Sequence, residues 1–152
     1  MTNEAPSLKP YTGEYRHGMD PKNRITVPAA WRSEEGGCEV YIRVGGAGSC
    51  LQVLTKGAFN EAWAKLKYHP KLIPEKRESA ARMFAARTTQ CTIDKQGRMV
   101  LPPHLCQAID TSDGVILVGA TDRFEVWNPQ RWEETQAAEQ EDFDNLTKSL
   151  GL

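Results

Sequence analysis

Two short stretches of this 152-residue chain place an arginine four positions after an aspartate, an arrangement that could build a nucleic-acid contact. One runs from Asp20 to Arg24 and the other from Asp94 to Arg98. An aspartate carboxylate accepts hydrogen bonds from backbone N–H groups two residues further on and so fixes a turn. An arginine guanidinium binds phosphate oxygens or the edge of a guanine through its fork of N–H groups. The spacing therefore predicts two rigid turns, each of which holds a guanidinium at or near its tip.

The stretch around each pair is an internal repeat. Residues 17–32 align with residues 91–106, and the same offset brings Pro28 onto Pro102. The Asp-x-x-x-Arg pattern alone occurs freely by chance, but two copies in register, each leading to a proline four residues after its arginine, do not. The repeat therefore predicts two copies of one supersecondary unit.

The residues inside the two turns fit this interpretation. Asn23 and Gly97 occupy matching positions, and these residue types tolerate a positive φ best. Lys22 and Lys95 add positive charge to the turns, and alternating apolar residues after each arginine predict a half-buried strand. Spacing alone leaves two hypotheses open: structural hairpins whose arginines neutralise their own aspartates, or cationic tips that contact phosphates or base edges.

The elements that must position these turns recur in both copies. After each motif the sequence predicts a short helix, two strands and a longer capped helix. The short helix after Pro28 is expected to end at Gly36, and Thr55 and Asn128 are the expected caps of the longer helices. A further helix over 75–86 follows the first copy as a linker, and aromatic residues at helical spacing are predicted to lie in the core. The predicted strands span 40–44, 51–54, 115–118 and 124–127.

The linker joins the two copies in one chain, and this connection determines the expected fold class. A single small, strand-rich repeat leaves sheet edges unpaired, so the two copies are expected to interleave into one barrel. The predicted organisation is a flexible tail over 1–12, a first repeat over 13–57, a helical linker over 58–87, a second repeat over 88–131 and a C-terminal helix over 132–152.

Composition agrees with a globular protein. Hydrophobic residues make up 39% and charged residues 26% of the chain, and no apolar run reaches transmembrane length. The first 12 residues lack the apolar region of a signal peptide, so a cytoplasmic location without a membrane partner is expected. The four cysteines are far apart and have no histidine at zinc-ligand spacing, which predicts free thiols and neither a metal nor a cofactor.

The charge is unevenly distributed. The net charge of −1 lacks the basic excess typical of a nucleic-acid binder. Cations nevertheless cluster around the two motifs, Arg16 among them, and acidic residues gather in the C-terminal helix. We expect DNA to approach the motif face and to avoid the acidic one.

Enzyme chemistry is not indicated. The candidate nucleophiles and bases are Ser49, Cys50, His17, His69 and His104, and none lies in a nucleophile elbow or near a recurring carboxylate pair. The sequence therefore predicts a protein without catalytic activity or a small-molecule substrate.

From about residue 13 to 135 the chain resembles the MraZ family of bacterial transcription regulators, which belong to the AbrB/SpoVT class of swapped-hairpin DNA binders. The resemblance rests on both motifs and on the residues around them. Asn23 departs from a usual glycine, and Cys106 departs from a usual arginine. The matching residues are Gly13–Tyr15, His17, Asp20–Arg24, Ile25–Pro28, Trp31, Arg32, Cys50, Leu51, Trp63, Asp94–Arg98, Leu101, Pro102, Val118, Gly119, Phe124–Trp127 and Trp132.

The resemblance implies an α+β fold in which two tandem AbrB/SpoVT-like repeats interleave into one swapped-hairpin β-barrel with peripheral helices. It also implies a closed homo-oligomeric ring that binds tandem direct repeats in promoter DNA and controls the division and cell-wall gene cluster at the nucleoid. An antitoxin-like protein-binding module of the same barrel class is the alternative. The expected DNA-binding residues are Arg24, Arg98, Lys22, Lys95 and Arg16, and the expected turn-organising residues are Asp20, Asp94, Asn23 and Gly97.

Overall fold

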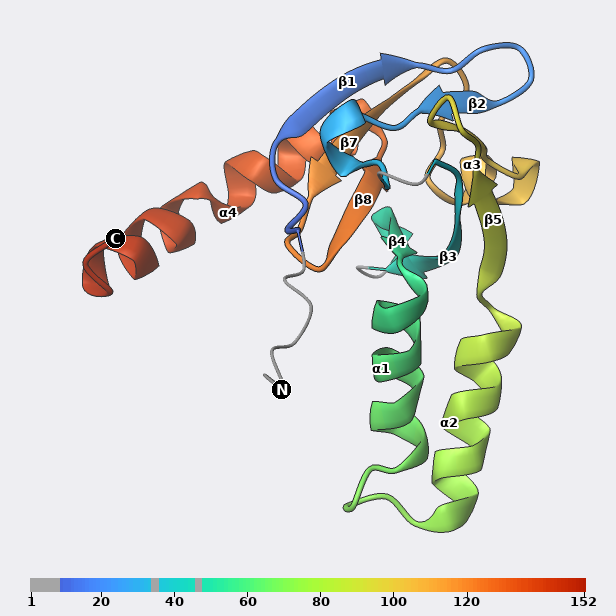
Figure 1. Cartoon of the computed structure of the whole chain (residues 1–152). Helices are drawn as coiled ribbons and strands as arrows, with labels where there is room; N and C mark the ends of the chain where they lie inside the picture. Colours follow the sequence, from blue (N-terminus) through green and yellow to red (C-terminus); the bar gives the residue numbers. More distant parts are fainter. Residues whose placement is uncertain (1–8, 34–35, 46–47) are drawn as a thin grey trace, which may run out of the picture.

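The computed structural model describes residues 9–33, 36–45 and 48–152. Over these residues the chain forms one eight-stranded antiparallel sheet, which nearly closes into a barrel, with helices outside it (Figure 1). The strands are β1 (Glu14–Gly18), β2 (Arg24–Thr26), β3 (Cys38–Gly45), β4 (Cys50–Leu54), β5 (Thr89–Ile93), β6 (Arg98–Val100), β7 (Gly114–Gly119) and β8 (Arg123–Trp127). The helices are α1 (Lys56–Lys67), α2 (Pro74–Ala86), α3 (Pro103–Ala108) and α4 (Pro129–Ser149), with a 3-10 turn over Ala29–Trp31.

The strand order confirms that the two copies interleave. The sheet runs β1-β7-β8-β4-β3-β5-β6-β2, so every strand of the first copy pairs with a strand of the second. Within the first copy only β3 and β4 pair with each other. The fold is therefore the predicted α+β barrel of two interleaved repeats.

A pseudo-two-fold axis passes through the pair β2 and β6. Ile25 faces Met99 in the register, and these residues occupy equivalent positions in the two copies. The flanking bonds repeat the symmetry: the Val27 N–H donates to the Gly97 carbonyl at 2.7 Å, and the Leu101 N–H donates to the Asn23 carbonyl at 2.9 Å. Each motif turn is thus fixed by the strand of the other copy.

The core lies inside the barrel and explains the alternation of the strands. Ile25, Met99 and Phe124 are almost fully buried, and Trp31 packs against Phe124 with ring centroids 5.2 Å apart. The buried positions in β2 and β6 alternate with accessible ones, as expected for strands with one face on the core. The arginines of both motifs therefore fall on the outer face.

The aromatic residues of α1 and α2 do not lie where the sequence predicted them. None of the side chains of α1 or α2 is buried, so their aromatic residues are not part of the core. Phe59 instead stacks between Tyr41 and Phe84 at centroid distances of 4.6 and 5.5 Å. The prediction of a core role for these rings is wrong because the barrel closes on itself and leaves the helical hairpin outside.

Two local features also differ from the sequence prediction. The short helix after Pro28 is a single 3-10 turn, since Arg32 adopts an extended conformation at φ −83° and ψ 149°. Tyr11 falls in the expected flexible tail, yet it forms a bridge with Thr121 and its ring packs against Trp31. Most of that expected tail, residues 1–8, lies outside the described part of the chain. The caps at Thr55 and Asn128 are as predicted.

Candidate nucleic-acid interface

The first turn is organised by Asp20. Its Oδ1 atom accepts hydrogen bonds from the backbone N–H groups of Lys22 and Arg24, both at 2.9 Å, and its Oδ2 atom accepts from the Arg24 Nε. The Asn23 N–H closes the turn on the Asp20 carbonyl at 3.0 Å, and Asn23 has a φ of 58°. The pKa of the Asp20 carboxyl lies below its ordinary value of 3.8, chiefly because the Arg24 backbone N–H donates to it. The charged form, and with it the turn, is weakened only as pH falls through that lowered pKa.

The second turn has the same backbone bonds and a looser ion pair. Asp94 Oδ1 accepts from the N–H groups of Gln96 and Arg98 at 2.9 and 2.8 Å, and the Gly97 N–H donates to the Asp94 carbonyl. The Arg98 Nε, however, lies 3.8 Å from Asp94 Oδ2, beyond hydrogen-bonding distance. The Arg98 guanidinium instead donates from its Nη2 to Gln96 Oε1 at 3.3 Å, within the same turn.

Both arginines lie on the outer face of one two-stranded ribbon, defined here as β2 and β6. Arg24 faces Val100 across the ribbon and Thr26 faces Arg98, so the two arginines are diagonal neighbours. Diagonal neighbours in an antiparallel pair are separated by about 7–8 Å. The two side chains line one shallow depression with Val100, and they are 36% and 41% exposed. The ribbon thus presents two guanidinium groups from one rigid surface.

The other predicted cations are placed differently. Lys22 and Lys95 are exposed on the two turns, beside the ribbon. Arg16 lies on β1 and donates from its Nη2 to Glu133 Oε1 of α4 at 2.8 Å. The structure therefore joins Arg16 to the acidic helix and does not bring it together with the ribbon arginines.

Asn23 and Cys106 depart from the residues usual at their positions. In the other copy, the residues that correspond to them are Gly97 and Arg32. Arg32 donates from its Nε to the Val27 carbonyl and lies so close to Gly97 that a Cβ atom added there would meet the Nε at a separation no structure tolerates. The equivalent of Arg32 in the second copy is Cys106, whose Sγ lies 3.8 Å from the Leu101 carbonyl. At the symmetry-related turn, this position therefore holds a cysteine and not a long cationic side chain.

That turn is the one that carries Asn23. Asn23 stands where the second copy has Gly97, and Cys106 stands where the first copy has Arg32. The pseudo-two-fold axis therefore maps the contact of Arg32 with Gly97 onto the positions of Cys106 and Asn23, so each pair combines a smaller and a larger residue. A consequence is that the Arg32 guanidinium lies beside the second turn, whereas the corresponding residue for the first turn is the Cys106 thiol.

Two residues of this outer face were not among the predicted site residues. Thr26 and Val100 share the outer face with the arginines, and Val100 is 52% exposed. The alternation of Met99 and Leu101 already places Val100 on the opposite face, and the register adds that it lies across from Arg24. An exposed valine between two arginines supplies an apolar contact of the kind that a thymine methyl group accepts.

The cysteines are mostly withdrawn from this surface, although the half-buried Cys91 is among the residues that line the depression. Cys50 and Cys106 are buried, and all four cysteines are free. Burial, with Glu125 nearby, raises the pKa of the Cys50 thiol to about 12. Among the described residues, no group of three or more histidine, cysteine or acidic side chains is placed to hold a metal ion, and no described helix is long and apolar enough to cross a membrane.

Comparison with known proteins identifies similar chains. The family described as "MraZ protein, putative antitoxin-like" matches residues 83–151. A protein of Ligilactobacillus salivarius named "Transcriptional regulator MraZ" is 34% identical over 140 residues, which cover 92% of this chain and 96% of that protein. Proteins with the same name from Heliobacterium modesticaldum and Caldanaerobacter subterraneus are each 32% identical, over 92% and 91% of this chain and 96% and 94% of their own lengths.

Proposed function

Because the chain belongs to the MraZ family of transcriptional regulators, we propose that it binds specific DNA sequences through the outer face of its β2–β6 ribbon. The observation that carries the proposal is the diagonal placement of Arg24 and Arg98 on one exposed, rigid surface. The major groove of B-DNA admits a two-stranded ribbon, and arginine bound to guanine O6 and N7 is the commonest specific contact there.

Each motif residue has a distinct role in this proposal. Arg24 and Arg98 contact base edges or straddle the rim of the groove, and Lys22 and Lys95 contact the flanking phosphates. Asp20 and Asp94 hold the turn backbones. The Asp94 carboxylate also lines the depression, where it lies 3.8 Å from the Arg98 Nε. The hydrogen bond from the Arg24 Nε to Asp20 leaves the two Nη groups for a bidentate contact.

The charge of one chain supports binding by an assembly. Each turn carries two cations and one aspartate, a net charge of +1, so one ribbon supplies only two net positive charges. Affinity for DNA rises with the number of phosphates neutralised, and linked weak sites gain affinity without new contacts. We therefore expect a closed ring of subunits to bind tandem direct repeats of the target sequence.

The regulated genes follow from the family. The protein is expected to act on promoters of the division and cell-wall gene cluster, its own promoter included, in the cytoplasm at the nucleoid. It has no catalytic role in this proposal, in agreement with relatives that are named as regulators.

One observation favours a second function. The acidic helix α4 extends from the barrel with almost all of its distal side chains exposed, and the matching family description includes the words "antitoxin-like". An acidic arm could bind a basic protein in the absence of DNA. Capture of such a protein that persists without DNA and is lost when α4 is removed would favour this function.

Replacement of Lys95 by alanine tests the phosphate contacts. We expect weaker binding that is nearly uniform across DNA sequences, because phosphate contacts carry no sequence information. The slope of log affinity against log salt should fall in magnitude by about one for each engaged subunit. Fluorescence anisotropy over a salt series measures both quantities, and Lys65→Ala on α1 is the matched control. An unchanged slope for Lys95→Ala would contradict a phosphate contact at this turn.

A further inference from the structure

Among the described residues, the contacts of helix α4 with the barrel come from its first turns. Trp132 packs against Trp127 with ring centroids 5.2 Å apart, Arg131 donates to the Gly48 carbonyl at 3.2 Å, and Glu133 binds Arg16. From residue 136 to the C-terminus every side chain except that of Thr147 is exposed. At about 1.5 Å per residue, this 21-residue helix extends roughly 30 Å, mostly away from the barrel (Figure 1).

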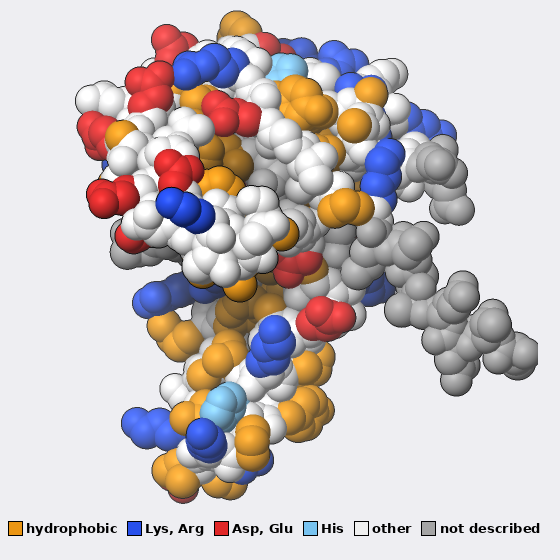
Figure 2. Space-filling model, turned by 90° about the vertical axis from the view of Figure 1, so that its left-hand side faces the viewer, with side chains coloured by type: hydrophobic (Ala, Val, Ile, Leu, Met, Phe, Trp, Pro, Cys, Tyr) orange, Lys and Arg blue, Asp and Glu red, His pale blue; other side chains and the backbone are white. Residues whose placement is uncertain are grey.

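The free end of α4 carries an apolar stripe. Phe143, Leu146 and Leu150 follow the spacing of one helix face and are 61%, 58% and 64% exposed. Glu139 and Asp142 lie one turn before the first two and share that face. The segment from Glu133 to Leu150 contains six carboxylates and one lysine, and Figure 2 shows acidic side chains gathered on the side where α4 ends.

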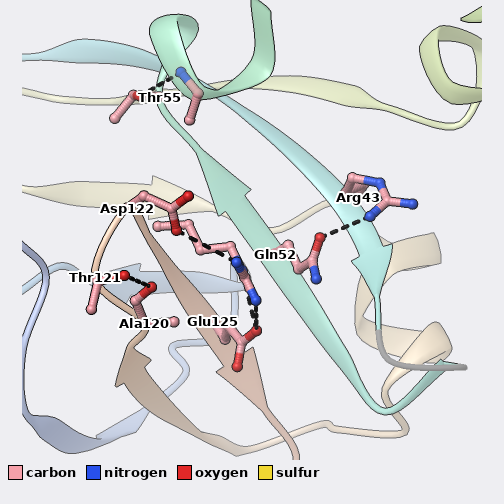
Figure 3. A network of polar contacts seen from close by, with 9 residues as sticks. Arg43, Gln52, Thr55, Ala120, Thr121, Asp122 and Glu125 are labelled. Carbon is pink, nitrogen blue, oxygen red and sulfur yellow. Dashed lines mark hydrogen bonds and ion pairs between the residues drawn. The ribbon is translucent and has the colours of Figure 1, made fainter. Parts of the chain in front are cut away.

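A groove of complementary character lies between α2, α3 and β3. Val44 and Met83 are 36% and 45% exposed on its walls, and Arg87 and His104 add polar and cationic groups. Arg43 is held in it by a 2.8 Å hydrogen bond to Gln52 (Figure 3). Its guanidinium also lies over the Phe84 ring, 4.9 Å from the ring centroid. No carboxylate is among the described residues that line this groove.

We infer that the apolar stripe of α4 docks in the α2–α3–β3 groove of a second copy of this chain. Apolar side chains meet apolar walls, and Glu139 and Asp142 meet Arg43 and Arg87. Pairing of α4 with α4 is disfavoured, because each arm, with six carboxylates and one lysine, carries a net negative charge that would repel the other arm in either direction. This inference rests on the proposed ring and names the surfaces that build it.

The positions of the two surfaces fit a ring. α4 projects from one side of the barrel, and α2 and α3 lie on the other side (Figure 1). A contact between two different surfaces of one chain is heterologous, and it produces a ring when the rotation between copies closes. None of the described residues that line the α2–α3–β3 groove lines the depression of the β2–β6 ribbon, so the groove and the ribbon use different side chains.

Complementation between two full-length variants tests the contact. The arm variant carries Phe143→Glu and Leu146→Glu, and the groove variant carries Met83→Glu and Arg87→Glu. All four side chains are exposed, so each variant should keep the wild-type melting temperature. Tyr68→Glu, at a 64% exposed aromatic residue outside both surfaces, is the control.

Sedimentation velocity measures the assembly state of each variant alone and of their equimolar mixture. Each variant alone is expected to lose assembly, and an equimolar mixture is expected to form a dimer, because one intact arm and one intact groove remain. Assembly by either variant alone would overturn the inference. Loss of assembly by the arm variant but not by the groove variant would show α4 pairing with α4 and would also overturn it.

The test separates this contact from DNA recognition. Arg24→Ala with Arg98→Ala should leave the ring intact and abolish DNA binding, whereas the arm variant should lose the ring and keep weak binding to a single repeat. If the arginine variant kept its DNA affinity while complementation succeeded, the proposed function would fail and the docking contact would stand.

Discussion

Replacement of both Arg24 and Arg98 by alanine should abolish specific DNA binding. A bidentate arginine contact to a base is worth about 1–3 kcal/mol, so the double change should weaken one ribbon by roughly 10²-fold or more. In an assembly that engages several repeats, the loss is multiplied over the subunits and should exceed the range of a gel-shift or anisotropy titration. The DNA affinity is measured by titrating the protein into the promoter fragment that lies upstream of its own gene.

The fold should be unaffected by this double change. The two ion pairs are more than a third exposed on the arginine side, and such pairs contribute about 0–1 kcal/mol to stability. Melting temperature and native mass should therefore match the wild type. Arg82→Ala, an exposed arginine of α2, should leave the DNA affinity unchanged. Full affinity in the double variant would contradict the assignment of these residues.

Separation of the chain into residues 1–87 and 88–152 should abolish folding of either part as a monomer. In the first part only β3 and β4 keep each other as partners, because β1, β2 and the outer edges of β3 and β4 pair with the second copy. An isolated two-stranded hairpin is marginally stable in water. Neither part alone should show a cooperative thermal transition by circular dichroism, and mixing should restore one.

The complementary pairs described above make this association selective. In a homodimer of the first part, Arg32 would meet Asn23 in place of Gly97 and would have to give up its hydrogen bond to the Val27 carbonyl. Asn23→Gly removes that conflict and should allow the first part to associate with itself. A stable homodimer of the unsubstituted first part would contradict the role of these pairs in selecting the partner.

The repeated motif is the part of the fold that sequence predicts well. The backbone bonds from Asp20 and Asp94 are local, so the spacing of each motif contains the information that fixes its turn. The two caps are local for the same reason. The unpaired edges of one repeat also predict interleaving, which is a general requirement of sheets and not a detail of these residues.

The features that sequence did not predict depend on long-range contacts. Arg16 pairs with Glu133, 117 positions away, and Tyr11 packs on Trp31 and Thr121. The apolar pattern of α1 and α2 is the same whether a helix lies in a core or against the outside of a barrel. The size match of Asn23 with Cys106 requires the two copies to be superimposed in space, and a single sequence does not supply this.

The central claim is that the outer face of the β2–β6 ribbon contacts DNA. Photo-cross-linking with benzoylphenylalanine in place of Val100 measures this contact directly. The matched control places benzoylphenylalanine at Tyr68, at the tip of the hairpin formed by α1 and α2. Both positions are exposed, at 52% and 64%, and the hairpin lies at the opposite end of the molecule (Figure 1). We predict covalent attachment to the promoter fragment from position 100 and none from position 68. Attachment from position 68 alone would contradict the account.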